Sequence, residues 1–158
     1  MSLVFDHRHL LPPGIHDATL AEVDKCFACF QKSDRRMTLF KKLTAYVAEV
    51  KRIGWGCTVI IDGSFVMPPV DEPNDIDIIL VLVMPRDWDL AAKLRPFEYN
   101  VVSKRYTKKE YNIEVYPVLP GSVAEQDYLN LFEQVRLEWC QKFNWPKGSK
   151  KGIVRIVP

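Results

Sequence analysis

The sequence lacks the features of a membrane protein and of a strongly basic nucleic-acid-binding protein. No segment approaches the roughly 18 continuous apolar residues of a membrane-spanning helix. The first residues, MSLVFDHRHLLPPG, carry Asp6 and Arg8 before any apolar run could reach the length of a signal peptide. The formal net charge is only +2, so bulk charge does not indicate nucleic-acid binding. We therefore expect a soluble, cytoplasmic protein without a membrane segment.

Cysteine is also sparse, with four residues in the chain. Cys26 and Cys29 form a C-x-x-C motif, CFAC, which can indicate a zinc or redox site. The sequence lacks both a second C-x-x-C and a histidine pair at zinc-finger spacing. The motif also lies in the segment LAEVDKCFACFQ, whose apolar residues have helical spacing. We therefore favour packing cysteines in a reducing compartment, with a zinc or redox motif as the alternative.

What is present is the composition of one ordinary globular domain. The 158 residues are 47% hydrophobic and 27% charged, and a chain of this length can bury a core. We find no internal repeat, low-complexity tract or shift in composition. The sequence therefore predicts a single domain over residues 1–158. Residues 1–20 are expected to form an extended N-terminal arm, because Pro12-Pro13-Gly14 interrupts regular structure there.

Helical and strand patterns follow one another along the chain. Apolar residues at helical spacing predict helices from about residue 20, from Ser33 or Asp34 to Gly54, and over about 123–142. A short helix over 86–94 is a further prediction. Runs rich in β-branched residues predict strands at 57–61, 75–83, 111–119 and 152–157. After its two aspartates, the strand at 75–83 is apolar on both faces and should lie inside a sheet. Together these patterns predict an α+β fold, with helices packed on a mixed sheet.

Two carboxylates stand at the start of the most apolar predicted strand. Asp75 and Asp77 are two positions apart, so on a strand they face the same way. Placing both near a buried sheet costs desolvation and repulsion unless a cation lies between them. Glu114, on a later strand, holds a polar position between Ile113 and Val115. If the two strands are neighbours, the three carboxylates converge at one edge of the sheet. Such oxygen donors suit Mg²⁺ or Mn²⁺.

A possible phosphate-binding turn precedes these acids. Gly63 lets the backbone approach a phosphate closely, and Ser64 offers N–H and O–H donors. Taken singly, each feature is weak, since Gly-Ser is a common turn and Asp77 could be a charge on an edge strand. A third carboxylate in phase on another strand makes the combination more specific.

The combined pattern resembles a known signature. Gly63-Ser64, then Asp75-x-Asp77, then Glu114 on a later strand, resembles that of the DNA polymerase β-like nucleotidyltransferase superfamily. The segments LLPPGIHDAT, IDGSF and KGIVRI also resemble a family of short stand-alone prokaryotic proteins of unassigned function with this core. The resemblance implies that Asp75 and Asp77 ligate the catalytic metals, two Mg²⁺ or Mn²⁺ ions. It further implies that Glu114 completes the site as a metal ligand and catalytic residue. Gly63 and Ser64 would hold the β- and γ-phosphates of an NTP.

The residues around the Gly-Ser pair depart from that signature. Minimal nucleotidyltransferases of toxin–antitoxin type commonly continue with a basic residue and an Arg-Gly pair, whereas this chain continues with Phe65, Val66 and Met67. A triphosphate would therefore need a Lys or Arg from elsewhere in the chain. Asp62 stands before the glycine, where an aliphatic or aromatic residue is usual. It either forms a turn hydrogen bond or adds charge to the metal site.

Basic and aromatic residues alternate in SKRYTKKEY, directly before the Glu114 strand. Aromatic side chains among cations suit a nucleotide base or single-stranded RNA. We expect Lys104 and Arg105 to contact the nucleotide from a loop, and a solvated charged loop is the alternative. Further basic residues lie in the C-terminal part, at Lys147, Lys150 and Lys151. Those of the long helix, Arg35, Arg36, Lys41 and Lys42, should form its solvent-exposed face.

The leading prediction is an enzyme that transfers a nucleoside monophosphate from an NTP to a hydroxyl and releases pyrophosphate. The acceptor could be an RNA end such as that of a tRNA, a protein side chain or a small molecule. Toxin–antitoxin or phage-defence roles follow by analogy alone. The alternative is a catalytically degenerate module of the same fold that acts as an antitoxin-like partner or nucleotide sensor. A third interpretation is an RNA-binding protein that uses residues 104–111, with salt-sensitive binding that needs no Mg²⁺.

Overall fold

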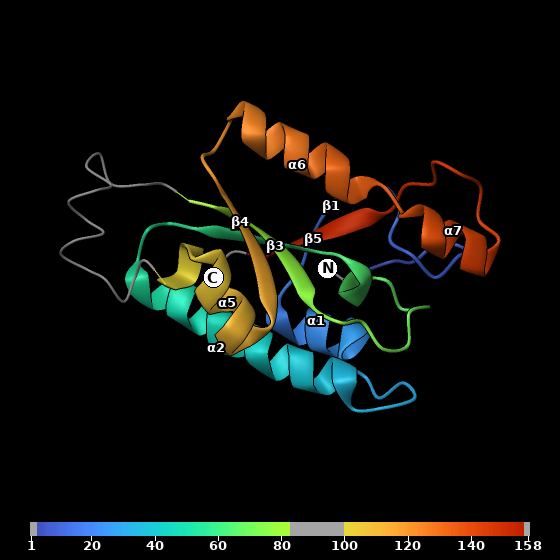
Figure 1. Cartoon of the computed structure of the whole chain (residues 1–158), viewed down its shortest axis with the longest axis horizontal. Coiled ribbons are helices and arrows are strands. Elements are labelled where there is room, and N and C mark those ends of the chain that lie inside the picture. The colour runs from blue at the N-terminus through green and yellow to red at the C-terminus, as the bar shows by residue number, and fades with distance from the viewer. Residues whose placement is uncertain (1–2, 83–99, 157–158) are drawn as a thin grey trace.

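A mixed five-stranded sheet forms the centre of the computed structural model, which describes residues 3–82 and 100–156. The strands follow the order β1-β5-β2-β3-β4 (Figure 1). They are β1 (Gly14–Asp17), β2 (Thr58–Asp62), β3 (Ile76–Val81), β4 (Ile113–Val118) and β5 (Gly152–Ile156). β1 is parallel to β5 and β3 to β4, whereas β2 is antiparallel to both of its neighbours. The predicted α+β class and mixed sheet are confirmed.

Five α-helices lie within the described residues. They are α1 (Leu20–Phe27), α2 (Arg35–Ile53), α5 (Lys104–Tyr111), α6 (Val123–Glu133) and α7 (Leu137–Phe143). Two short 3-10 turns, η1 (Ser64–Val66) and η2 (Asn100–Val102), complete the set. The short helix predicted over 86–94 lies outside the described residues. No helix in the described ranges is long and apolar enough to cross a membrane.

The sheet is covered on both faces, which explains the apolar run in β3. Helices α1 and α2 lie below the sheet in Figure 1, and α6 lies above it. Ile78 and Leu80 belong to the large core on the α1–α2 side, whereas Ile79 packs in the smaller core on the α6 side. The interior position of β3, between β2 and β4, confirms the prediction made for this strand.

Local capping signals set several helix ends. Thr19 caps α1 and forms a reciprocal capping box with Glu22. Gly54 ends α2 in the left-handed conformation at φ 69°, as expected for a C-terminal glycine. α1 ends at Phe27, so it does not extend through CFAC. Cys26 is half-buried against the core, but Cys29 is exposed, and all four cysteines are free. The packing role predicted for Cys29 is therefore wrong, because the helix stops before that residue.

Tertiary contacts change two predicted segments. The end of the expected N-terminal arm, Gly14–Asp17, is the edge strand β1 paired with β5. The helix expected over about 123–142 is divided into α6 and α7. Between them, the chain pairs with residues next to β5. Gln134 forms a bridge with Lys150, and the Val135 N–H donates to the Ser149 carbonyl at 2.9 Å. In a continuous helix these backbone N–H and C=O groups would form hydrogen bonds within the helix, whereas here they bond to residues 149–151.

Arg36 contradicts the prediction of an exposed basic face on α2. The side chain is fully buried. Its guanidinium donates to the carbonyl oxygens of Phe27, Phe65, Met67 and Val70 at 2.6 to 2.9 Å. Burial lowers the pKa of Arg36 to about 10, so the group is still a cation at neutral pH. The arginine therefore fastens the segment after the Gly-Ser turn to α2, a contact that a helical pattern cannot reveal.

Candidate functional site

Three carboxylates lie in one row across β2, β3 and β4. Asp62 is the register partner of Asp77 in the antiparallel pair, and Asp77 is the partner of Glu114 in the parallel pair. Register partners project from the same face of a sheet. Asp75 lies at the entry of β3, two residues before Asp77. The structure thus brings Asp77 and Glu114 together on neighbouring strands, and it adds Asp62 to the same row.

Asp77, in the middle of the row, has a strongly perturbed carboxyl group. Its side chain is only 6% exposed. Burial, followed by the negative charges of Asp75, Asp62 and Glu114, raises the pKa of Asp77 to about 7. No basic side chain pairs with it among the described residues. Like charges placed opposite one another destabilise a sheet, so the row carries a cost that marks a candidate functional site.

Two lysines neutralise the other members of the cluster. Lys151, which sequence analysis assigned to the basic C-terminal part, is buried in an ion pair with Asp62. Burial raises the pKa of Asp62, although the charge of Lys151 acts against this. From α5, the Lys108 ammonium lies 2.6 Å from Asp75 Oδ2 and 3.5 Å from Glu114 Oε1. Partial burial lowers the pKa of Lys108, but the two carboxylates outweigh this and raise it.

The Gly-Ser turn lies directly against Asp77. Gly63 has a φ of 83°, which favours glycine. A Cβ atom at this position would lie 2.7 Å from Asp77 Oδ2. Ser64 begins η1 and lines the same cavity as Asp77. Both backbone conformation and close approach therefore require glycine here, which places the predicted phosphate holder beside the predicted metal ligands.

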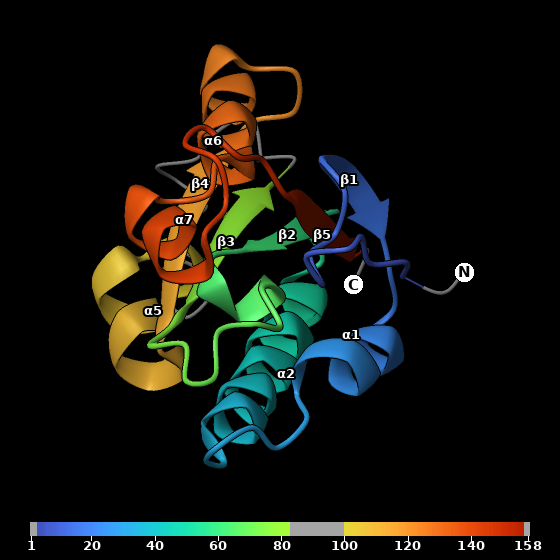
Figure 2. The same cartoon turned by 90° about the vertical axis from the view of Figure 1, so that its right-hand side faces the viewer.

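The acids form one wall of a cavity of about 570 Å³, a volume typical of small-molecule sites. Its lining includes Asp62, Gly63, Ser64, Asp75, Asp77 and Glu114. The opposite wall comes from the end of α6, the α6–α7 connection and α7, the two helices labelled near the top and left of Figure 2. This wall combines apolar side chains with Arg136 and Trp139. The cavity can therefore hold a ligand that has an apolar or aromatic part and a second part that is cationic or that meets the acids through a cation.

Lys104 and Arg105 lie on a helix rather than on the predicted loop. Residues 104–111 form α5, and neither predicted nucleotide-binding residue lines the cavity. Lys104 Nζ lies 4.5 Å from the centre of the Tyr116 ring, and Tyr116 does line it. Lys108, one turn after Lys104, reaches the carboxylates instead. Because they are one helical turn apart, Lys104 and Lys108 both face the candidate site. The sequence prediction had instead named Lys104 and Arg105 as the nucleotide-binding residues.

Arg136 is a further residue that sequence analysis missed. Its side chain is 74% exposed and has a long, 3.8 Å ion pair with Glu138. Its positive charge acts to lower the pKa of Asp62, although burial of that carboxyl dominates. Arg136 lies in the break between α6 and α7, which the sequence pattern presented as continuous helix. No local signal distinguishes it from the other basic residues of the chain.

The donor set fits a divalent cation in its chemistry. Carboxylate oxygens are the ligands that Mg²⁺ and Mn²⁺ prefer, and a cation would offset the burial of Asp77. As the side chains stand, however, no three His, Cys, Asp or Glu residues in the described ranges form a group ready to hold a metal ion. Asp75 and Glu114 are bonded to the Lys108 ammonium instead.

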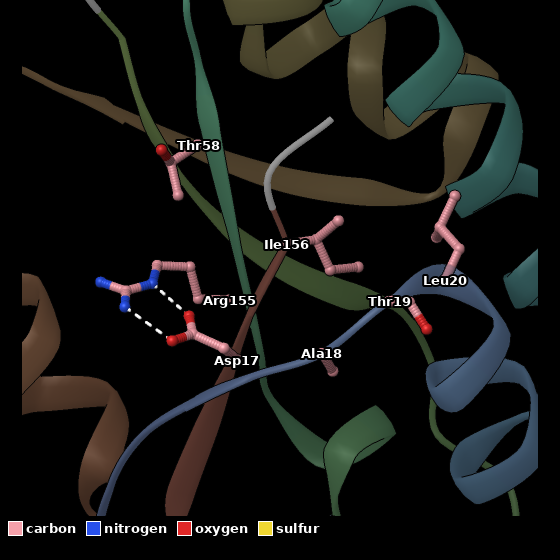
Figure 3. A pocket seen from close by; sticks show the side chains of 7 residues that line it. All are labelled: Asp17, Ala18, Thr19, Leu20, Thr58, Arg155 and Ile156. Carbon is pink, nitrogen blue, oxygen red and sulfur yellow. Dashed lines mark hydrogen bonds and ion pairs between the residues drawn. The ribbon is translucent and has the colours of Figure 1, made fainter. Parts of the chain in front are cut away.

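A second hollow, of about 670 Å³, lies at the β1 edge of the sheet and is shown in Figure 3. The charged residues that line it are Asp17 and Arg155, and they pair with each other. Arg155 Nε and Nη2 donate to the Asp17 carboxylate at 2.6 and 3.0 Å. The rest of its lining consists of aliphatic side chains and two threonines. We therefore assign the candidate site to the cavity beside the acid row.

Comparisons with known proteins give a family but no activity. No curated protein and no solved structure matches the chain. The sequence profile described as "Family of unknown function (DUF6932)" matches residues 3–157, which is nearly the whole chain. The chain therefore belongs to DUF6932, a family of unknown function.

Proposed function

We propose that the protein is a metal-dependent nucleotidyltransferase with a polymerase β-like fold, which moves a nucleoside monophosphate from an NTP to a hydroxyl acceptor. The observation that carries this proposal is the position of Asp77. It is buried in a row between Asp62 and Glu114, it touches the Gly63 turn, and it pairs with no basic side chain in the described chain. A carboxylate in such surroundings is costly unless a cation joins it.

The acid wall supplies the residues for the metal. Asp75, Asp77 and Glu114 would hold two Mg²⁺ or Mn²⁺ ions. When bound, these ions neutralise phosphate charge and polarise the reacting phosphoryl group. Of these three acids, Asp77 is the buried one, whereas the Asp75 and Glu114 side chains are 25% and 43% exposed. The two outer acids can therefore rearrange around a ligand more easily than Asp77.

The remaining cavity residues suit a triphosphate. The backbone N–H groups and the hydroxyl of Gly63-Ser64 would bind the β- and γ-phosphates. The chain has no basic residue directly after this pair. Arg136 lines the opposite wall of the same cavity, has a largely exposed side chain and is weakly paired. It would supply the cationic contact that the Gly-Ser turn lacks.

The reaction would then proceed mainly by positioning. The acceptor hydroxyl oxygen attacks the α-phosphorus, and the bond from the α-phosphorus to the pyrophosphate oxygen breaks. The hydroxyl proton passes to Glu114 or to solvent. Glu114 lines the cavity and is partly exposed, so an incoming acceptor can reach it. Orientation and charge stabilisation then supply most of the rate enhancement. A cytoplasmic location, and an acceptor that is RNA, protein or a small molecule, belong to the same proposal.

Label transfer tests this function. The purified chain is incubated with Mg²⁺ or Mn²⁺, each α-labelled NTP in turn, and a cell extract that contains RNA and protein. We expect label on one class of molecule with the wild type, loss of label with Asp77→Asn, and retention with Glu72→Gln. Glu72 is an exposed acid of the loop before β3, outside the carboxylate row, and so controls for a general loss of negative charge. If no nucleotide gives label transfer, the proposal that the protein is a nucleotidyltransferase is contradicted.

The alternative is a binding module of the same fold, acting as a nucleotide sensor or an antitoxin-like partner. One observation favours it: Lys108 already neutralises Asp75 and Glu114, and the described residues form no ready metal group. Such a module would bind NTP without transferring label. Its biological effect would also survive the double substitution Asp75→Asn and Asp77→Asn, whereas an enzyme would lose its effect while still folded.

A further inference from the structure

Lys108 places a positive charge among carboxylates that the proposed function assigns to a metal. Its ammonium donates to Asp75 Oδ2 at 2.6 Å and lies 3.5 Å from Glu114 Oε1. An ammonium bonded to a carboxylate oxygen uses the lone pairs that a metal ion would use. The divalent cation and Lys108 therefore compete for the same two side chains.

We propose that Lys108 is a displaceable resident cation, which holds Asp75 and Glu114 together in the metal-free protein and leaves their oxygens when a divalent cation binds. Lys108 is then a positioning residue, since it acts on the reaction through the metal ligands. This inference rests on the proposed function, because that function assigns the metal to Asp75 and Glu114. It also accounts for a set of oxygen donors that suits a divalent ion yet forms no ready metal group.

The backbone of α5 fixes where Lys108 starts. Thr107, the preceding residue, is fully buried, and its hydroxyl donates to the Ile113 carbonyl at 3.0 Å. Asn112, directly after the helix, donates from its side chain to the Asn74 carbonyl at 2.9 Å. These bonds tie both α5 and the start of β4 to the segment that enters β3. The position of the Lys108 backbone beside the two acids is therefore set by a fixed helix.

The side chain of Lys108 is nevertheless free to leave. It is 46% exposed, and partly exposed ion pairs contribute little to stability because water and salt screen them. The Lys151–Asp62 pair differs, since both side chains are almost fully buried, and separating them would leave uncompensated charges inside the protein. A divalent ion would also bind Asp77, which has no basic partner among the described residues, and this additional ligand favours the ion over Lys108. Exchange is therefore expected at Lys108 and not at Lys151.

Titration of the full chain with Mn²⁺ tests the exchange, with free Mn²⁺ followed by electron paramagnetic resonance and no nucleotide present. We expect Lys108→Met to bind Mn²⁺ about two- to fivefold more tightly than the wild type, because the competing ion pair is gone. Lys108→Arg restores a cation at the same place and should return the affinity toward the wild-type value. Lys109→Met removes the same charge from an exposed neighbouring position of α5 and should leave the affinity unchanged.

The possible results separate this inference from the proposed function. Equal or weaker Mn²⁺ binding by Lys108→Met overturns the inference, while Mn²⁺ binding by the wild type still supports a metal site. If neither protein binds Mn²⁺ although circular dichroism shows both to be folded, the metal site and the inference both fail. A brace with a purely structural role would lower the melting temperature of Lys108→Met without tightening Mn²⁺ binding. Lys108→Gln provides a second neutral variant if the methionine variant does not fold.

Discussion

Replacing Asp77 by asparagine should stabilise the metal-free protein while removing the nucleotidyl transfer that we propose for it. Asn has nearly the same shape as Asp, so the contact with the Gly63 backbone is kept. The negative charge is removed from a site where burial and three neighbouring carboxylates oppose it. Proteins commonly keep functional residues that lower the stability of the fold. Asp77 is the residue at which this cost should be largest.

The size of the gain follows from the pKa. The pKa of Asp77 is raised from 3.8 to about 7. Each pKa unit corresponds to about 1.36 kcal/mol, so ionised Asp77 costs the fold up to about 4 kcal/mol above pH 7. The amide avoids this cost, although it gains less than the full amount because it remains buried. We expect Asp77→Asn to raise the free energy of unfolding by roughly 2 to 4 kcal/mol at pH 8.

The gain should depend on pH in a definite direction. Since the pKa is higher in the folded than in the unfolded state, the folded protein binds more protons than the unfolded chain between about pH 4 and 7. The free energy of unfolding of the wild type therefore falls as the pH rises through this window. Asp77→Asn should show a shallower fall. Part of the fall should remain in this variant, because burial also raises the pKa of Asp62.

Urea unfolding at pH 5 and pH 8 in metal-free buffer, followed by tryptophan fluorescence, measures these differences. Asp75→Asn is the matched control, since Asp75 is partly exposed and paired with Lys108. It should be neutral or destabilising by less than about 1 kcal/mol. An Asp77→Asn protein that is no more stable than the wild type at pH 8, or equally stabilised at both pH values, would refute the reasoning. Mn²⁺ should stabilise the wild type and not the Asp77→Asn protein.

Further predictions concern the residues that hold the acid row and the turn beside it. Arg36→Met should lower the free energy of unfolding by at least about 3 kcal/mol, because buried carbonyl oxygens lose their donor; a loss under about 1 kcal/mol in urea would contradict this role. Lys151→Met should cost about 3 to 5 kcal/mol by leaving Asp62 buried and unpaired. Adding Asp62→Asn should recover most of that loss, and a double variant as unstable as the single one would argue against the pair. Gly63→Ala should cost about 1 to 3 kcal/mol through its positive φ and its contact with Asp77, measured as a lower melting temperature, and an unchanged melting temperature would show that the turn can relax.

Much of the fold was predictable because its signals are local. The apolar run at 78–81 marks an interior strand, and Gly54 marks the end of α2. The break between α6 and α7 could not be predicted, because it comes from pairing with residues 149–151, which follow later in the chain. Arg36 was misassigned for a similar reason. Its carbonyl partners lie between residues 27 and 70, so no periodicity along α2 reveals them.

For the candidate site, the sequence by itself determined the chemical groups. It identified Asp75, Asp77 and Glu114 as carboxylates on two strands, and a Gly-Ser turn suited to phosphate. Tertiary structure alone decided how these groups interact. Strand register placed Asp62 in the same row, and the packing of α5 brought Lys108 to the outer acids. The pKa of a carboxyl group depends on its burial and on its distance to other charges. Both are set by segments far apart in the chain, so only the folded protein makes Asp77 the buried acid that lacks a basic partner among the described residues.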